Sequence, residues 1–342
     1  MEQLVGMLPE ELEKFVASLG EKPFRARQLL AWIYRKGAAD IDGMTDLSRS
    51  FRNRLAEAAR IGLPDVLKIS QAADGTMKLL LGLDDGRTIE SVIIPDEGRT
   101  TLCVSSQVGC GLGCAFCMTG RLGLKRDLTA AEIVGQVIVA GNYLGERGGG
   151  LTNIVFMGMG EPLLNYDEVR RALMLILSER GLSFSWRHVT ISTAGIPKMI
   201  GRLGGEILVN LAVSLNAPDD ETRSPIMPIN KKYPLAALMG ALRAYPLKRG
   251  RRITLEYVLL SGINDSDQHA RALARLVKGL RVKINLIPFN PFEGAAFTRP
   301  DDGRVLGFQE VLIEKHLFAV VRKSKGADIG AACGQLAAAT RT

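Results

Sequence analysis

Between about residue 100 and residue 290, short apolar runs rich in β-branched residues alternate with helical patterns. The helical patterns cover, for example, 130–140, 166–177 and 268–277. Runs that are buried on both faces and alternate with helices indicate a parallel sheet with right-handed crossovers. We therefore predict an α/β fold built as a partial (β/α)6 barrel. The six predicted strands are 101–105, 153–157, 188–192, 208–214, 253–259 and 283–287.

Nearly every predicted strand ends in a polar or glycine-rich segment. These segments read CVSSQVGCG, MGMGEPLLN, STAG, SLNAP, LSGIND and IPFNP. In barrels of this type, the carboxyl ends of the strands build the active site. Segments that are far apart in the sequence are therefore expected to meet at one mouth.

The first 98 residues follow other patterns. Residues 1–62 show helical spacing, and acidic and basic residues nearly cancel there, which predicts a small helical accessory domain. Residues 63–98 show short β-type runs separated by Asp-Gly turns, which predict a β-rich linker or extension before the barrel of residues 99–342. The helical part is either a cap packed by its apolar faces or a substrate-docking domain. In the second case, the side chains facing phosphates would be Arg25, Arg27, Arg35 and Lys36.

Composition excludes several classes of protein. The 342 residues are 46% hydrophobic and 23% charged, which is too apolar and too mixed in charge for a disordered chain. No apolar run approaches the roughly 20 residues of a membrane span, and the acidic, amphipathic start is no secretory signal. We expect a soluble, cytoplasmic protein. The net charge of +8 favours a polyanionic partner, although many proteins that never meet nucleic acid are equally basic.

The five cysteines carry more information than the charge. An odd number in a chain without an export signal argues against a disulfide framework. Cys110, Cys114 and Cys117 form a C-x3-C-x2-C motif on a glycine-rich loop, where three thiolates can surround one metal centre. A zinc site would need a fourth ligand, and none is evident nearby. A [4Fe–4S] cluster with one iron left for a non-protein ligand fits the spacing best.

A C-x3-C-x2-C motif after the first strand of a (β/α) barrel resembles the radical S-adenosylmethionine (SAM) superfamily. Three further features narrow the resemblance: Cys103 seven residues before Cys110, the segment FMGMGEP at 156–162, and the isolated Cys333 in AACGQL. Together they resemble the RlmN/Cfr family of radical SAM RNA adenine methyltransferases, and within it the C2-methylating branch. The match extends from the helical cap to Leu336.

The resemblance implies a catalytic thiol cycle. In this family the C-terminal cysteine, here Cys333, is methylated by one SAM, and a second SAM yields a 5′-deoxyadenosyl radical that abstracts hydrogen from the S-methyl group. The carbon radical then adds to C2 of adenine. The family's resolving thiol, here Cys103, releases the methylated base through a transient disulfide with Cys333. Glu90, thirteen residues before Cys103, matches the family's general base. Without the resemblance, Glu90 would equally well be a solvent-exposed side chain.

The resemblance also implies two cofactors, one [4Fe–4S] cluster per chain on Cys110, Cys114 and Cys117, and SAM. In the family, SAM is held mainly at strand ends. Asn216 stands where a histidine is frequent in the family. The matching SAM-binding positions here are Gly160, Glu161, Ser192, Ser214, Leu215, Asn216 and Asn290.

The implied substrates are adenosines of 23S rRNA and of tRNA next to the anticodon. An electron donor such as flavodoxin, a monomeric state and no membrane contact are also implied. Two other functions stay open, a C8-methylating enzyme of the same family and a non-catalytic iron–sulfur or zinc RNA-binding module. A short charge run is often only a solvated loop. The candidate phosphate contacts are Lys125, Arg126, Arg223, Lys231, Lys232 and the runs 248–252 and 322–325.

Overall fold

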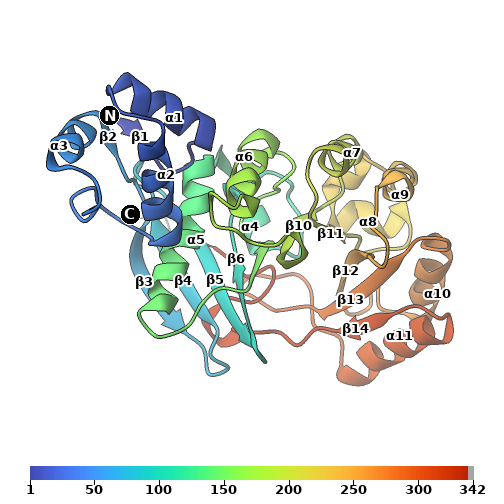
Figure 1. Ribbon diagram of the computed structural model, residues 1–342. Helices are drawn as coiled ribbons and strands as arrows, with labels where there is room; N and C mark the ends of the chain where they lie inside the picture. Colours follow the sequence, from blue (N-terminus) through green and yellow to red (C-terminus); the bar gives the residue numbers. More distant parts are fainter. Residues whose placement is uncertain (338–342) are drawn as a thin grey trace.

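A single ten-stranded sheet forms the centre of the computed structural model, which describes residues 1–337 (Figure 1). In spatial order its strands are β14, β13, β12, β11, β10, β9, β6, β5, β4 and β3. All neighbours from β6 to β14 are parallel, whereas β3 to β6 pair antiparallel. The bounds are β3 Asp65–Gln71, β4 Met77–Gly82, β5 Thr88–Asp96, β6 Arg99–Cys103, β9 Asn153–Phe156, β10 Val189–Thr193, β11 Asn210–Ser214, β12 Ile253–Leu259, β13 Val282–Pro288 and β14 Ala319–Val321.

The parallel half of the sheet confirms the predicted α/β fold. Each of the six predicted strands is present, as β6 and β9 to β13, in the predicted order. The hydrogen-bonded order runs from β14 to β3 without joining its ends, as expected of a partial barrel. The edge strand β14 was not predicted, because a three-residue run is too short to show a period.

Helices connect the parallel strands and pack against the sheet (Figure 1). In α6 the buried residues Val169, Leu173 and Ile176 recur at helical spacing, which places one apolar face toward the core. Four helices begin at a side chain that accepts a backbone N–H, at Thr129, Asp219, Ser266 and Asp301. The bounds are α5 Ala130–Gly145, α6 Tyr166–Leu177, α7 Pro197–Glu206, α8 Asp220–Ile226, α9 Leu235–Ala244, α10 Asp267–Leu276 and α11 Asp302–Glu314.

The N-terminal region is helical, as predicted, and lies at the end of the sheet formed by β3 to β5 (Figure 1). Asn142 on α5 donates to the carbonyl of Gly37, so the helices are anchored to the barrel. One apolar core extends from Leu4 to Leu336 across the whole described chain. The elements are α1 Pro9–Ser18, α2 Phe24–Leu30, the π-helical turn η1 Ala31–Arg35, α3 Arg49–Ala58 and a parallel pair of β1 Glu2–Gln3 with β2 Ala59–Arg60.

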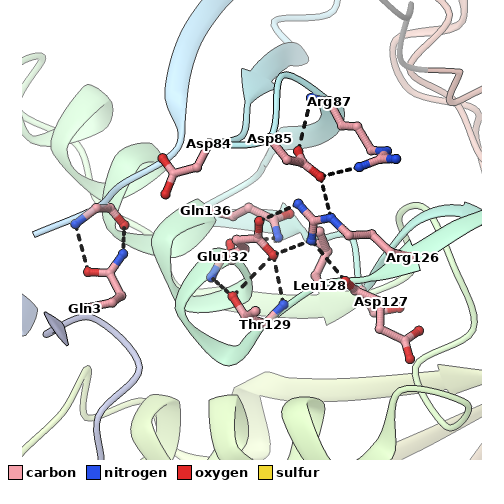
Figure 2. A network of polar contacts seen from close by, with 12 residues as sticks. Gln3, Asp84, Asp85, Arg87, Arg126, Asp127, Leu128, Thr129, Glu132 and Gln136 are labelled. Carbon is pink, nitrogen blue, oxygen red and sulfur yellow. Dashed lines mark hydrogen bonds and ion pairs between the residues drawn. The ribbon is translucent and has the colours of Figure 1, made fainter. Parts of the chain in front are cut away.

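The region 63–98 is not a free linker, because its strands continue the main sheet through the β5–β6 pair. A polar network fastens its second turn to α5 (Figure 2). Arg126 donates to Asp85 at 2.7 Å and to both carboxylate oxygens of Glu132 at 2.7 and 2.8 Å. Glu132 also completes the capping box with Thr129 at the start of α5. Arg126, a candidate phosphate contact, is therefore occupied by two carboxylates of its own chain.

The remaining elements surround the cysteine loop or connect strands. None of the helices within residues 1–337 combines the length and the hydropathy needed to cross a bilayer. The short elements are β7 Gln107–Cys110, β8 Gly123–Asp127, α4 Met118–Arg121, η2 Trp186–His188, η3 Pro228–Lys231 and η4 Ala327–Ile329.

Candidate active site

A cavity opens where the carboxyl ends of β9 to β13 meet the cysteine loop and the C-terminal segment. Its empty space, including the open mouth, is about 980 Å³. Ten of the predicted site residues line it: Cys110, Cys114, Cys117, Gly160, Glu161, Ser192, Ser214, Asn216, Asn290 and Cys333. The predicted residues Glu90, Cys103 and Leu215 lie outside this lining.

The cysteine loop leaves β7 at Cys110 and enters α4 after Cys117. Gly109 has a φ of +78°, and a Cβ there would lie 1.9 Å from the carbonyl oxygen of Gly123, so only glycine permits this pairing of β7 with β8. The loop is fastened by Ala115, whose N–H donates to the carbonyl of Ile226 at 3.0 Å. Burial raises the pKa of the Cys110 thiol to about 11, and the charges of Cys117 and Glu161 add to this shift. Burial also raises the pKa of Cys114, so both of these thiols stay neutral unless a metal centre binds them.

The three thiols fit an iron–sulfur cluster as donors. Within residues 1–337, no three His, Cys, Asp or Glu side chains lie close enough together to share a single metal ion. In a four-iron cluster, each cysteine binds a different iron, so the sulfurs surround a cube instead of one point. Cys110, Cys114 and Cys117 are spread along the wall of one cavity, which matches that requirement better than a closed zinc site.

Glu161 is held rigidly at the wall of the cavity. Its carboxylate accepts from the N–H of Ala194 at 2.7 Å and from that of Leu163 at 3.1 Å. Burial nevertheless raises the pKa of Glu161, and no cation among the described residues contributes to offset this shift. A ligand ammonium group in the cavity would supply that charge. Gly160, at a φ of +100°, would bring a Cβ within 2.5 Å of Gln107, so the glycine is required by packing as well as by the cavity.

The ends of β10 and β11 contribute Ser192 and Ser214 to the lining. Asn216 lines the cavity too, but its Oδ1 accepts from the N–H of Val258 at 2.8 Å and its Nδ2 lies 3.1 Å from the sulfur of Met227. Its main visible role is therefore to join β11 to β12. Leu215 is fully buried in the core, so any contact of this position with a ligand would have to come from its backbone.

Residues 326–337 form a segment that we call the C-terminal strap. The strap carries Cys333, which is exposed to the cavity. The carbonyl oxygen of Cys333 accepts from Asn290 Nδ2 at 3.1 Å, and that of Gly334 accepts from the N–H of Met118 at 2.7 Å. The strap thus joins the end of β13 to the cysteine loop, and Asn290 contacts the strap directly.

Cys103 ends β6 and is buried beside the strap. Burial raises the pKa of the Cys103 thiol to about 12, and the neighbouring Cys333 adds to the shift. Burial and the charge of Glu256 raise the pKa of Cys333 as well. The fold therefore brings two thiols that are 230 positions apart in the sequence close enough for the charge of Cys333 to affect the pKa of Cys103.

Glu90 lies on β5 and is buried behind the strap. Val92 is the register partner of Cys103, so Glu90, two positions away on the same strand, points to the same face of the sheet as Cys103. Its carboxylate pairs with Lys78 Nζ at 3.1 Å and accepts from the N–H of Ala337 at 2.8 Å. Lys78 also donates to the carbonyl of Gly330 at 3.2 Å. Glu90 and Lys78 therefore fasten the strap to β4 and β5.

Sequence reasoning missed Glu256, a buried carboxylate of β12 that lines the cavity. Asn285 Nδ2 donates to it at 2.9 Å, and burial raises the pKa of Glu256. A signal was present, since a glutamate within a run expected to be buried on both faces is unusual.

The prediction that Arg223 contacts RNA is wrong, because Arg223 is fully buried. Its guanidinium donates to the carbonyls of Ala194, Ser214 and Leu215 and to the side chain of Asn230, at 2.7 to 3.0 Å. It therefore holds together the carboxyl ends of β10 and β11. Burial lowers the pKa of Arg223 to about 10. In the sequence it stands in a polar helical segment, which gives no sign of burial.

Comparison with known proteins decides the family. The N-terminal domain model of ribosomal RNA large subunit methyltransferases matches residues 2–61, and the radical SAM superfamily model matches residues 104–274. A protein of Syntrophobacter fumaroxidans named dual-specificity RNA methyltransferase RlmN is 53% identical over 328 residues, 96% of each chain. The chain belongs to the RlmN family. A Geobacter sulfurreducens RlmN is 51% identical over 338 residues, which are 98% of this chain and 92% of that relative.

The RlmN-family assignment is matched by structure. A crystal structure of a radical SAM methyltransferase from Sphaerobacter thermophilus superposes with a TM-score of 0.96 at 45% identity. The match covers 99% of this chain and 100% of that one. These findings confirm the resemblance and the radical SAM fold predicted from the cysteine motifs.

Proposed function

We propose that this RlmN-family chain is a radical SAM methyltransferase that methylates C2 of adenosine in 23S rRNA and in tRNA next to the anticodon. The observation that carries the proposal is that Cys333 lines the same cavity as three more cysteines, while Cys103 is buried close enough to Cys333 for the charge of that thiol to raise the pKa of Cys103. Three thiols suffice to hold a cluster, so the further pair needs a separate role. The RlmN names of relatives that match nearly the whole chain support the same conclusion.

C2 of adenine is electrophilic and its hydrogen is not acidic, so direct methyl transfer from SAM finds no nucleophile there. When bound, a [4Fe–4S] cluster and SAM would supply the electron, the methyl group and the hydrogen-abstracting radical that the reaction needs. Cys110, Cys114 and Cys117 would hold the cluster. Glu161 would accept from the amino group of SAM, and Ser192 and Ser214, which line the cavity at the ends of β10 and β11, would hydrogen-bond to its hydroxyl groups.

Cys333 carries the methyl carbon into the cavity, because it is the cysteine of the strap that is exposed there. After the base has bonded to that carbon, C2 must lose its hydrogen as a proton, and we assign acceptance of this proton to Glu90, on the same sheet face as Cys103. The surplus electron of the adduct would return to the oxidised cluster. Cys103 then attacks, as the thiolate, the sulfur of Cys333. The S–S bond forms as the bond between sulfur and carbon breaks, and the electron pair stays with the base, whose new methyl carbon takes up a proton. The raised pKa of Cys103, about 12, opposes formation of that thiolate.

The same proposal covers the cellular compartment, the electron donor, the oligomeric state and the domain organisation. A disulfide that must be reduced in every turnover favours the reducing cytoplasm. We propose an electron donor such as flavodoxin, and a monomeric enzyme. The match of residues 2–61 to a methyltransferase N-terminal domain supports a helical accessory domain over 1–62, followed by the extension 63–98 and the barrel from residue 99 onward.

Anaerobic turnover with methyl-labelled SAM on rRNA and tRNA fragments, followed by mass spectrometry of the nucleosides, tests this function. We expect 2-methyladenosine and about four irons per reconstituted chain. The Cys333→Ala variant is expected to keep its iron and lose all methyl transfer. Retained transfer by this variant would refute the thiol cycle, and 8-methyladenosine as product would refute the C2 assignment.

A further inference from the structure

The amino-terminal ends of the parallel strands, opposite the cavity, bear a group of basic side chains. The segments entering β10, β12 and β13 supply them. Five of the six are exposed and one, Arg251, is half-buried. We call this group the strand-start patch: Arg187, Lys248, Arg249, Arg251, Arg252 and Arg281.

Contacts within the strand-start patch make it one continuous surface. The guanidinium groups of Arg187 and Arg251 lie 5.0 and 4.7 Å from the centre of the Trp186 ring. Arg281 donates to the carbonyl of Leu247 at 3.2 Å, which joins the segment before β13 to the one before β12. The patch therefore combines clustered cations with an aromatic ring between two of them.

The charges of the strand-start patch have no carboxylate partner within residues 1–337. None of its six side chains takes part in an ion pair there. Elsewhere in the molecule, arginines such as Arg126 and Arg202 are each paired with two carboxylates. Clustered like charges repel one another, and no carboxylate within the described part of the chain pairs with the patch to offset the repulsion. A polyanionic partner would do so.

We propose that the strand-start patch binds the phosphate backbone of the RNA substrate, at a distance from the adenosine that is methylated. The inference rests on the proposed function, because it takes RNA as the substrate. Arginine side chains bind phosphates with two parallel hydrogen bonds, and an aromatic ring beside arginines offers a surface on which an unpaired base stacks.

The position of the strand-start patch favours RNA as its partner over an acidic electron-donor protein. β12 and β13 each have seven residues, so the patch lies roughly 20 Å from the cysteine loop at the other end of these strands. A docked electron donor needs to be close to the cluster, whereas a large RNA reaches both ends of the barrel. A short anticodon stem-loop seated at the cavity lies at the opposite end of the strands and would have to pass around the barrel to reach the patch. The strand-start patch is therefore expected to serve long rRNA fragments.

The test compares two variants that each lose two positive charges, Arg187→Gln/Arg252→Gln in the patch and Lys68→Gln/Arg271→Gln at exposed positions outside it. Binding of a long 23S rRNA fragment is measured over a range of salt concentrations. We expect the patch variant to bind about fivefold more weakly, with a salt slope smaller by about 1.5, since each lost phosphate contact reduces the slope by roughly 0.7 to 0.9. We expect its methylation of the long fragment to show a raised KM, and its methylation of a short anticodon stem-loop to be unchanged.

Equal binding by the patch variant and the control variant overturns the inference. So does a patch variant that keeps RNA binding and loses reduction by flavodoxin while dithionite still reduces it, because the partner is then an acidic protein. If the wild type binds through the patch but methylates neither RNA, the patch inference holds and the proposed function fails. Should the first patch variant fold poorly, Lys248→Gln/Arg249→Gln on the exposed loop gives the same comparison.

Discussion

Charged side chains are buried at the carboxyl ends of the parallel strands and exposed at their amino ends. At the carboxyl ends, Glu161 and Glu256 are buried in the cavity wall and Arg223 is enclosed behind it. At the amino ends, the basic side chains of the strand-start patch remain in water. A buried charge is tolerated only when hydrogen bonds replace its hydration, so the groups around the cavity are held in fixed positions. Exposed charges are free to attract a partner over a distance. Chemistry needs the first arrangement and capture of a large substrate needs the second.

The largest expected effect is a loss of catalysis that leaves RNA capture unchanged. Replacing Cys103 by Ser removes the thiol that releases the base, so we expect a covalent protein–RNA adduct to accumulate and multiple turnover to be lost. Denaturing gels of anaerobic reactions with labelled RNA detect the adduct. The salt dependence of RNA binding should stay unchanged, because the amino ends are untouched. A Cys103→Ser/Cys333→Ser control should form no adduct, and an adduct there would contradict the assigned roles.

The buried Arg223 and the exposed Arg187 allow the two ends of the strands to be compared by their contribution to stability. Arg223→Met leaves three backbone carbonyls without their donor in a buried place, so we expect the free energy of unfolding to fall by about 3 kcal/mol. Arg187→Met, at the exposed end, should change it by less than about 0.5 kcal/mol. Urea titration of the metal-free proteins measures both. If the free energy of unfolding fell by a similar amount in both variants, burial of Arg223 would not be the cause of its effect on stability.

The smallest expected effect concerns pH. Burial raises the pKa of Glu256 above its ordinary value of 4.5, so the folded state holds its proton more tightly than the unfolded state. This group therefore favours folding below pH 4.5 and that contribution is lost as the pH rises through the folded-state pKa. Glu256→Gln should raise the unfolding temperature at pH 8, and the gain should shrink toward pH 5. A gain that is independent of pH would show that ionisation of Glu256 is not its cause.

Much of the fold was predictable because its signals are local. The strand and helix periods, the Asp-Gly turns and the cysteine spacing each depend on a few neighbouring residues. The strand β14 escaped prediction because its three residues show no period. For region 63–98 the sequence predicted short strands in a linker or extension but not their partners, since strand patterns do not reveal which edge they pair with; in the structure they extend the sheet through β5.

The sequence predicted which residues belong to the site better than it predicted the contacts that these residues make. Ten predicted residues line the cavity, because parallel strands bring their carboxyl ends together. Contacts that depend on packing were not visible: Asn290 contacts the strap, Asn216 joins two strands, and Glu90 pairs with Lys78. Arg223 shows the limit of sequence prediction most clearly. It stands in a polar segment of the sequence, yet its buried side chain joins the ends of two strands.

By itself, the sequence determined the order of strands and helices, the cysteine set and the family, because spacing along the chain carries each of these. Only the tertiary structure decided that Glu90 pairs with Lys78, that Arg223 is buried, and that the basic residues of three separate segments form one surface opposite the cavity. The physical reason is that side-chain environment depends on which distant segments pack together. The pairing of strands sets that packing.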